Sequence, residues 1–422
     1  MYQAPVAAEA RPLPRVHSSP SLPAPGRSCK GWLSDGFTER DFFRPVSIAV
    51  SPAADTKGLT SRAARRLNVR TAWISRGTHV MRRLLVMSEG EQFVCYRYRW
   101  AAFAPALAAA GWRLEHVQRP RGGHEFVRTL KAIAAADAVV IQRRLVSGGK
   151  AWLIRRAART LLYDFDDSVY LRDSNSGPTA NDPVRWSRFR RMIRMADASL
   201  AGSPQLVAQA LRAAPAARVQ LVPTCIDPRG YALAAHDRPA GGPEMVWIGS
   251  RSTAASLGDA IPWLRAACAA APAARLTLVS DWVPELPGVR TRHVPWREST
   301  ETADLAGGDI GISWLPDHPW SLGKCGLKVL QYMAAGLPVV ANSVGIHARL
   351  VIHGETGFLA DDPEACRRAI TTLAASADLR RRMGQAGRAR VEREWSVAGW
   401  GPRLAAIVTA ACTRSAPQRV AA

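Results

Sequence analysis

Two lysines beside a pair of glycines are the residues of this chain best suited to bind a phosphate. The loop Gly323-Lys324-Cys325-Gly326 leads directly into a predicted helix over 327–335, and Lys328 lies in its first turn. A helix N-terminus attracts anions, because free backbone N–H groups and the helix dipole both point at the ligand. Only six lysines occur in this arginine-rich chain, which favours a site that uses compact point charges. We therefore expect a phosphate or diphosphate site, with ordinary solvated lysines as the alternative.

A second glycine-bearing loop, Gly249-Ser250-Arg251, follows a predicted strand and offers further contacts to a phosphate. Glycine lets the backbone approach a ligand, the hydroxyl of Ser250 can donate a hydrogen bond, and Arg251 can add charge. An ordinary turn between a strand and a helix is the alternative. Asp317 and Trp320 precede the lysine loop and should face the same site, where the Trp320 indole can stack on a base or a sugar.

Three aspartates gather in the sequence Asp164-Phe165-Asp166-Asp167, after a predicted strand. The carboxyl ends of parallel strands form the ligand-binding edge of such sheets. Clustered carboxylates need a neutralising cation, which can be a metal, as in metal-bound nucleotide sites and phosphohydrolases. We favour neutralisation by arginines, without a metal, in a polar site for the second substrate that includes Asp166 and Asp167. The arginines in question are Arg97, Arg99, Arg143 and Arg144.

Strands and helices alternate from residue 81 onward, which predicts an α/β fold with parallel sheets. Residues 1–80 are rich in Pro, Ser and Arg without a sustained period, and we expect a dispensable, disordered extension. Residues 81–236 should form a first Rossmann-like domain. Residues 237–396, which begin with a polar linker containing Pro and Gly, should form a second one. The amphipathic start of 397–422 should be a helix that crosses back onto the first domain.

The apolar runs predict strands of three to five residues, and the amphipathic runs predict the helices between them. The predicted strands are 84–88, 113–117, 138–142, 161–163, 198–201, 219–222, 245–248, 275–279, 289–293 and 310–314, with a further strand in GLPVVANS. The predicted helices are 101–110, 125–135, 150–158, 184–195, one that begins at Pro204 with Ser203 as its N-cap, 256–270, 301–305, 327–335, 363–375, 378–394 and 397–411. These elements predict two doubly wound domains that face one another.

The 422 residues carry a formal net charge of +23, which favours anionic partners such as nucleotide phosphates or an acidic membrane surface. Nucleic acid is disfavoured, because neither a basic stripe with interleaved aromatic residues nor a known module occurs. No apolar run is long enough to span a membrane, and the start does not resemble a signal peptide. Seven scattered cysteines without metal-ligand spacing are typical of a reduced, cytoplasmic protein without structural zinc.

The predicted second domain resembles the C-terminal half of GT-B glycosyltransferases of family GT4, also called glycosyltransferase group 1. Three segments carry the resemblance: GKCGLKVLQYMAA, GLPVVANSVGIHARLVIHGETGFLADDPEACRRAI and LRRRMGQAGRARVEREWS. In the first domain only the alternation of elements and short pieces such as YDFDD and AGSPQL agree. The resemblance implies a GT-B fold whose first domain binds the acceptor and whose second domain binds a nucleotide-sugar.

The chain departs from the family at a pair of glutamates. In the family, the helix that corresponds to 327–335 usually carries a Glu-x7-Glu pair. The second glutamate of this pair binds the ribose hydroxyls of the nucleotide. The matching positions here are Gly323 and Gln331, so both carboxylates are absent. Carried over by resemblance, Gln331 would hold the ribose. Lys328 would neutralise the donor diphosphate, helped by Lys324, and both lysines are the predicted catalytic residues, with Cys325 and Gly326 in the same donor loop.

The resemblance implies a retaining transferase that moves a hexose from a nucleoside-diphosphate-sugar donor to an acceptor hydroxyl. The acceptor would be a glycan, a lipid-linked molecule or a small molecule, as in cell-envelope or exopolysaccharide synthesis, and no metal or other cofactor is expected. The enzyme would be cytoplasmic, with possible peripheral contact to the inner face of the membrane. The alternatives are a GT-B-fold sugar-nucleotide epimerase, a non-catalytic sugar-nucleotide binding protein and a phosphohydrolase that depends on the aspartate cluster.

Overall fold

The computed structural model describes residues 81–172, 179–237 and 242–415. The disordered extension expected for residues 1–80 lies outside the described residues, as do residues 238–241 of the expected linker and the last residues of the tail. Within the described ranges, no helix combines the length and the apolar character that a membrane crossing requires.

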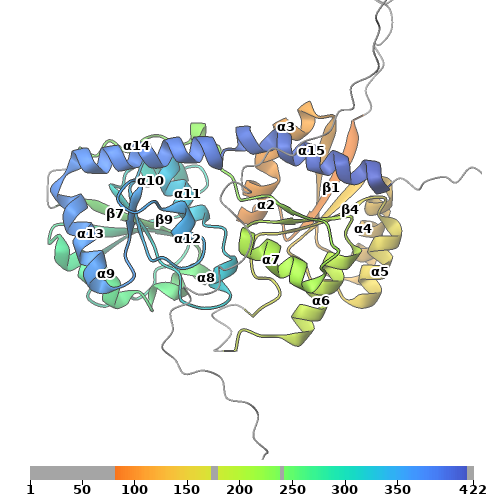
Figure 1. Ribbon diagram of the computed structural model, residues 1–422, viewed down its shortest axis with the longest axis horizontal. Coiled ribbons are helices and arrows are strands. Elements are labelled where there is room, and N and C mark those ends of the chain that lie inside the picture. Colours follow the sequence, from red (N-terminus) through yellow and green to blue (C-terminus); the bar gives the residue numbers. More distant parts are fainter. Residues whose placement is uncertain (1–80, 173–178, 238–241, 416–422) are drawn as a thin grey trace, which may run out of the picture. The chain divides into compact units, whose positions relative to one another are not determined.

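Two parallel sheets of six strands each form the core of the described residues (Figure 1). The first sheet consists of β1 (Arg82–Ser88), β2 (Trp112–Gln118), β3 (Ala138–Gln142), β4 (Leu161–Phe165), β5 (Ala198–Ala201) and β6 (Val219–Leu221). The second consists of β7 (Glu244–Ile248), β8 (Arg275–Ser280), β9 (Thr291–Pro295), β10 (Ile310–Ser313), β11 (Val339–Ala341) and β12 (Gly357–Leu359). Their spatial orders are β2-β1-β3-β4-β5-β6 and β12-β11-β10-β7-β8-β9. This confirms the predicted α/β class with two doubly wound domains.

Helices lie between the strands, as parallel connections require. In the first domain they are α2 (Val94–Arg99), α3 (Ala104–Ala109), α4 (Gly123–Ala135), α5 (Gly148–Ala157), α6 (Pro183–Met195) and α7 (Pro204–Ala213). In the second they are α8 (Arg251–Ala254), α9 (Ile261–Ala270), α10 (Glu301–Ala306), α11 (Leu327–Ala334), α12 (His347–Leu350), α13 (Pro363–Ala375) and α14 (Ala377–Glu394), and α15 (Val397–Ser415) ends the described chain. The hydroxyl of Ser203 accepts a hydrogen bond from the N–H of Leu206 at 3.3 Å, which confirms the predicted N-cap of α7.

The last helix crosses from the second domain back to the first. Figure 1 shows α14 and α15 following one another, and α15 packs against α3. Trp400, Leu404 and Val408 of α15 are buried in one cluster with Leu84 of β1. The indole N–H of Trp112 also donates to the hydroxyl of Thr409 at 3.0 Å. The predicted crossing helix is therefore confirmed, and it forms part of the first domain's core.

Several elements differ from their predicted bounds. Residues 94–99, expected in a loop, form α2, and the helix expected over 101–110 is a short 3-10 turn followed by α3. The helix expected over 256–270 begins at Ile261, after the short α8 and a 3-10 turn. The strand expected over 289–293 is β9, two residues later, because this edge strand is largely exposed and has little apolar pattern. The three-residue strand β12 was not predicted.

Candidate active site

A cavity of about 600 Å³ lies between the two domains, and we call it the interdomain cavity. From the first domain, the ends of β3 and β4 contribute Arg143 and Asp166 to its wall. From the second, the loops after β7 and β10 and the start of α11 contribute Gly249, Trp314 and Lys328. The carboxyl-terminal edges of both sheets therefore line one cavity, which is where folds of this kind bind ligands.

Lys328 places an ammonium group in the wall of this cavity without an acidic partner. The side chain is half-buried, and its Nζ lies 4.8 Å from the centre of the Trp247 ring. Burial and the neighbouring charge of Lys324 lower the pKa of Lys328 to about 7, and no described carboxylate opposes this shift. The cavity thus holds a cation that lacks a counter-charge.

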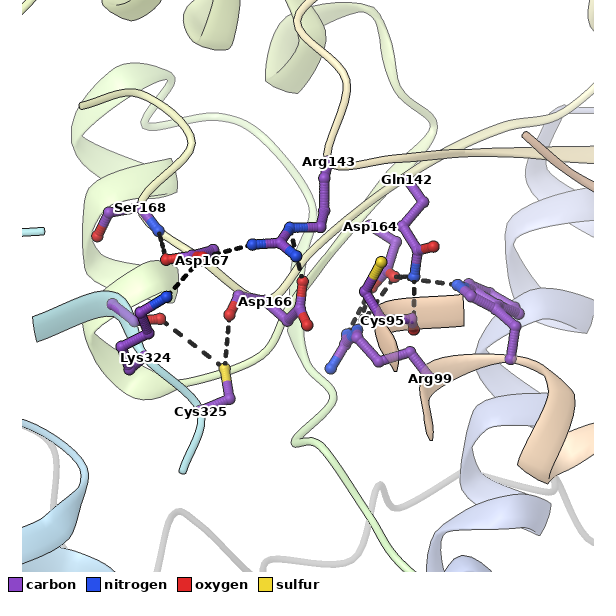
Figure 2. A network of polar contacts seen from close by, with 12 residues as sticks. Cys95, Arg99, Gln142, Arg143, Asp164, Asp166, Asp167, Ser168, Lys324 and Cys325 are labelled. Atoms are coloured by element: carbon purple, nitrogen blue, oxygen red, sulfur yellow. Dashed lines mark hydrogen bonds and ion pairs between the residues drawn. The ribbon is translucent and has the colours of Figure 1, made fainter. Parts of the chain in front are cut away.

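Lys324, the second predicted lysine, is held by groups on both sides. Its Nζ lies 3.0 Å from the carboxylate of Asp167 and 3.3 Å from the centre of the Trp320 ring. Asp167 also forms an ion pair with Arg143, and it accepts a hydrogen bond from the N–H of Ser168 at 2.9 Å. Lys324 therefore lines the cavity but shares its charge with a carboxylate of the first domain (Figure 2).

The lysine loop, residues 323–326, packs against the first domain. The thiol of Cys325 donates to the backbone carbonyl of Asp166 at 3.2 Å (Figure 2). A Cβ on Gly323 would overlap the hydroxyl oxygen of Ser168 and lie 2.9 Å from its backbone nitrogen. A Cβ on Gly202 would lie 3.0 Å from the Cα of Asp166. Gly323, which stands at the position of the family's first glutamate, therefore has no room for a carboxylate side chain.

Gly326 begins α11 in the left-handed conformation that favours glycine. Its φ is 71°, and a Cβ there would meet the side chain of Leu350. The carbonyl of Gly326 accepts from the N–H of Leu330 at 3.2 Å, which starts the helix. The sharp turn brings the first N–H groups of α11 to the cavity wall beside Lys328. Backbone donors and the unpaired ammonium are thus adjacent.

The aspartate cluster does not form a shared carboxylate site. Asp164 lies inside β4 and is fully buried, where it pairs with Arg99 and accepts hydrogen bonds from Trp100 and Gln142 at 3.0 and 3.1 Å (Figure 2). Asp166 and Asp167 point the other way and both pair with Arg143. Among the described residues, no group of His, Cys, Asp or Glu side chains could hold a metal ion.

The predicted ribose-binding residue Gln331 has a carboxylate beside it. Its amide donates to Glu301, at the start of α10, at 3.0 Å. Glu301 also accepts from the hydroxyl of Tyr98 and the indole N–H of Trp296, each at 2.7 Å, and burial keeps the pKa of Tyr98 raised so that it remains a donor. Glu301, Tyr98 and Trp296 line the cavity with Gln331. Sequence reasoning missed this cluster, since no motif connects these separate segments.

His347 lies close to Lys328 in the cavity wall and was also missed. Its Nε2 lies 2.9 Å from the hydroxyl of Ser313, and its Nδ1 lies 3.1 Å from the carbonyl of Asn342. Burial lowers the pKa of His347 to about 4, so the ring is neutral at neutral pH. Both ring nitrogens are engaged in these contacts, so His347 adds no charge to the cavity wall and fixes the hydroxyl of Ser313, which also lines the cavity.

The loop after β7 brings backbone and hydroxyl groups to the cavity. A Cβ on Gly249 would lie 2.5 Å from the ring of Trp247, so the close approach of the chain here requires glycine. The hydroxyl of Ser250 lies 3.0 Å from that of Ser252. Arg251 lies over the ring of Trp282 at 5.6 Å, outside the set of cavity-lining residues.

Ten of the fourteen predicted site residues line the interdomain cavity, and four lie elsewhere. The ten are Asp166, Asp167, Gly249, Ser250, Trp320, Lys324, Cys325, Gly326, Lys328 and Gln331. The four are Arg97, Arg99, Arg251 and Asp317. Arg97 forms an ion pair with Glu298 at 2.9 Å, and Arg99 is buried against Asp164, so neither guanidinium lies in the wall of the cavity.

One family model matches part of this chain, and solved structures of similar fold match most of it. Residues 314–390 match the family model described as glycosyl transferases group 1. A sucrose-phosphate synthase from Thermosynechococcus elongatus is similar over 79% of this chain and 100% of its own, with a TM-score of 0.62 and 20% identity. HepE of Anabaena, solved with UDP and glucose, is similar over 78% and 100%, with a TM-score of 0.58 and 15% identity. No curated protein matches the sequence.

A glycosyltransferase from Rickettsia africae ESF-5 has the same architecture, over 78% of this chain and 98% of its own, with a TM-score of 0.57 and 13% identity. At such identities the likeness concerns the fold. The matched segment 314–390 contains the lysine-bearing start of α11 and also Gln331. The chain has the GT-B fold, and its residues 314–390 match the family model of glycosyl transferases group 1, in agreement with the resemblance.

Proposed function

We propose that this chain transfers a sugar from a nucleoside-diphosphate-sugar donor to an acceptor hydroxyl, with retention, in the interdomain cavity. The observation that carries the proposal is the unpaired ammonium of Lys328 beside the first N–H groups of α11. A diphosphate at this place would supply the missing counter-charge and accept the backbone hydrogen bonds. The solved complexes of HepE with UDP and glucose, and of TarM with UDP and GlcNAc-glycerol, support the same classes of donor and acceptor.

The nucleotide ribose would lie against Gln331 and Glu301. The family's second glutamate is absent, but Glu301 brings a carboxylate within 3.0 Å of the Gln331 amide. A carboxylate accepts hydrogen bonds from two adjacent hydroxyls, while the amide can both donate and accept. Tyr98 and Gln331 already donate to one oxygen of Glu301, and Trp296 donates to the other. One ribose hydroxyl would therefore donate to the second oxygen of Glu301, and its neighbour would donate to the amide oxygen of Gln331.

The protein's contribution to the reaction would be positioning and electrostatic stabilisation. As the sugar–phosphate bond breaks, negative charge develops on the leaving diphosphate, where Lys328 and the N–H groups of α11 would stabilise it. The leaving phosphate oxygen would take the proton of the acceptor hydroxyl on the same face of the sugar, so no protein nucleophile is required. Asp166 and Asp167 are already neutralised by Arg143 and Lys324, which supports a reaction without a metal.

The donor most consistent with this site is a hexose linked to a nucleoside diphosphate, and the acceptor is a glycan, a lipid-linked molecule or a small molecule. Transfer to such acceptors would fit a cytoplasmic step of cell-envelope or exopolysaccharide synthesis. One observation favours a second candidate. Gly323 and Gln331 replace both family glutamates, and Gly323 has no room for a side chain, so a sugar-nucleotide epimerase or a non-catalytic binding protein is the alternative.

A donor panel separates these functions. UDP-, GDP- and ADP-sugars are first ranked by the thermal shift that they produce. The best donor is then incubated with and without sugar, glycerol and lipid-linked acceptors, while release of nucleoside diphosphate and the anomeric configuration of the product are measured. Acceptor-dependent release with a retained anomeric configuration is the expected result. Interconversion of the sugar without an acceptor would identify an epimerase, and binding without any turnover would contradict a transferase.

Lys328→Met tests the residue on which the proposal rests. The variant keeps the length of the side chain but removes its charge, so turnover should fall by several orders of magnitude while folding is preserved. Lys131→Met, at an exposed position of α4, is the matched control and should keep full activity. Near-normal turnover of the Lys328 variant would rule out the proposed role.

A further inference from the structure

Helices α5 and α6 of the first domain carry a basic surface with exposed apolar side chains that the proposed reaction does not use. Trp152 of α5 exposes 64% of its surface, and Val184 of α6 exposes 57%. Arg188 lies on the surface of α6, and Arg191 is half-buried one turn further on. We call these four residues and the arginines around them the α5–α6 surface. Large apolar side chains this exposed next to unpaired charge are typical of interaction sites.

The two helices place these side chains on one face. Residues four apart on a helix share a face, which aligns Val184 with Arg188 on α6 and Gly148 with Trp152 on α5. These faces of α5 and α6 approach each other at Arg191, three residues after Arg188. Its guanidinium lies 3.7 Å from a Cβ built on Gly148. Arg191 therefore lies beside the face of α5 that carries Trp152.

The charge of this surface is of one sign. Helix α5 carries three basic residues, α6 carries five, and neither carries an acidic residue. The aspartates at the two ends of α6 are already engaged, Asp182 as its N-cap and Asp197 with Arg155. None of the described carboxylates pairs with Arg188, Arg190, Arg191 or Arg194, and the last three line a shallow hollow of about 310 Å³.

The basic surface continues toward the interdomain cavity. Arg144 follows Arg143, which lines the cavity, and burial together with the positive charges of Arg119, Arg188 and Arg185 lowers the pKa of Arg144. Arg185 and Arg188 of α6 are thus close enough to repel the guanidinium of Arg144, which is next to the cavity-lining Arg143 in the chain. A partner bound at this surface would lie beside the cavity, on the side of the first domain.

We propose that the α5–α6 surface docks onto an anionic lipid bilayer. Arginines would hold the negative headgroups, while Trp152 and Val184 would enter the boundary between headgroups and acyl chains. An exposed aliphatic side chain such as Val184 on the same surface fits a lipid boundary better than a nucleic acid, whose bases need aromatic faces on which to stack. Docking here would bring the mouth of the cavity to the membrane surface, within reach of a hydroxyl on a membrane-bound molecule.

Vesicle sedimentation of the full chain tests this surface. The chain should sediment with vesicles of phosphatidylcholine and phosphatidylglycerol but not with phosphatidylcholine alone, and added salt should release it. Removing one charge near the surface weakens such binding about fivefold, so Arg188→Gln combined with Arg191→Gln should weaken it about 25-fold. Trp152→Ser should weaken it by at least about fivefold through lost apolar burial.

The control removes the same charge at another place. Arg367→Gln with Arg368→Gln, at exposed positions of α13, should leave vesicle binding within about twofold of the unchanged chain. Thermal melting verifies that every variant is folded. Equal losses in the α13 control, full binding by Trp152→Ser or no binding to anionic vesicles would each overturn the proposal. It would also be overturned if the α5–α6 variants lost binding to a single-stranded RNA oligonucleotide while vesicle binding stayed intact.

Discussion

The titration of Lys328 gives a measurable signature of diphosphate binding. The pKa of this lysine is lowered to about 7 in the free chain by burial and by Lys324. A bound diphosphate would favour the charged form and move the pKa back toward its ordinary value near 10. Binding of UDP above pH 7 should therefore take up a proton, and the affinity should fall as the pH rises.

The size of this effect follows from the pKa of the free chain. Above the free pKa, each pH unit reduces the affinity tenfold, which is about 1.4 kcal/mol. At pH 7 about half of the Lys328 side chains are charged, so the affinity for UDP should fall about fiftyfold between pH 7 and pH 9. The phosphates of UDP are already ionised in this range, because such groups titrate near pH 6. The titration of Lys328 alone would then determine how steeply the affinity for UDP falls with pH.

Folding stability should show the opposite trend in the free chain. The folded pKa of Lys328 lies below its unfolded value, so the unfolded chain binds more protons between about pH 7 and pH 10. The penalty for the buried charge is complete below pH 7 and disappears as the pH rises toward 10. Lys328→Met should therefore raise the melting temperature at pH 7 while it removes UDP binding, a combination that misfolding does not produce.

Calorimetry of UDP binding at several pH values, in buffers of different ionisation enthalpy, measures both affinity and proton uptake. The unchanged chain should take up close to one proton per UDP at pH 8, and Lys328→Met should take up none. Lys328→Arg keeps its charge throughout this range, so its affinity for UDP should not change with pH. Equal affinity at pH 7 and pH 9 for the unchanged chain, or an unchanged slope in Lys328→Met, would refute the reasoning.

Three further substitutions test the contacts around the cavity. Asp164→Asn should destabilise the fold by about 3–5 kcal/mol in urea unfolding, because it leaves the buried charge of Arg99 unpaired; a loss below about 1 kcal/mol would contradict this account. Gly323→Ala should destabilise by about 1–3 kcal/mol through its clash with Ser168, and adding Ser168→Gly should recover part of the loss, whereas additive losses would show that the two sites are independent. Glu301→Gln should weaken UDP binding about tenfold or more with little change in the affinity for inorganic diphosphate, and equal effects on both ligands would exclude a ribose contact.

The sequence predicts most of the fold because the central strands of both sheets are buried on both faces. The runs 138–142 and 198–201 are apolar except for one polar residue each and are fully buried, and β3 and β5 have these predicted bounds. The prediction fails where that signal is absent. Helix α2 is short and has aromatic and basic residues in alternation, and β12 has only three residues, so tertiary packing determines both.

The candidate site is predictable where a local motif carries it, and not where distant segments meet. The lysine loop and Gln331 stand out because several chemically meaningful residues are close in sequence. The partner of Lys324 is 157 residues away, and the partner of Asp164 is 65 residues away. Nothing near Glu301 in sequence indicates that it will lie beside Gln331. The pairing of Lys324 with Asp167 depends on how the two domains pack together, and the other two depend on the packing of distant segments within one domain.

The crossing helix sets an order for folding during synthesis. Trp400, Leu404 and Val408 of α15 complete the core of the first domain, although they are made after the entire second domain. Residues 81–237 therefore leave the ribosome with part of their apolar core uncovered, and every strand of the second sheet is made before α15 emerges to cover it. The domain that is synthesised first should be the last to reach its native packing. During that interval its exposed face would be a target for chaperones.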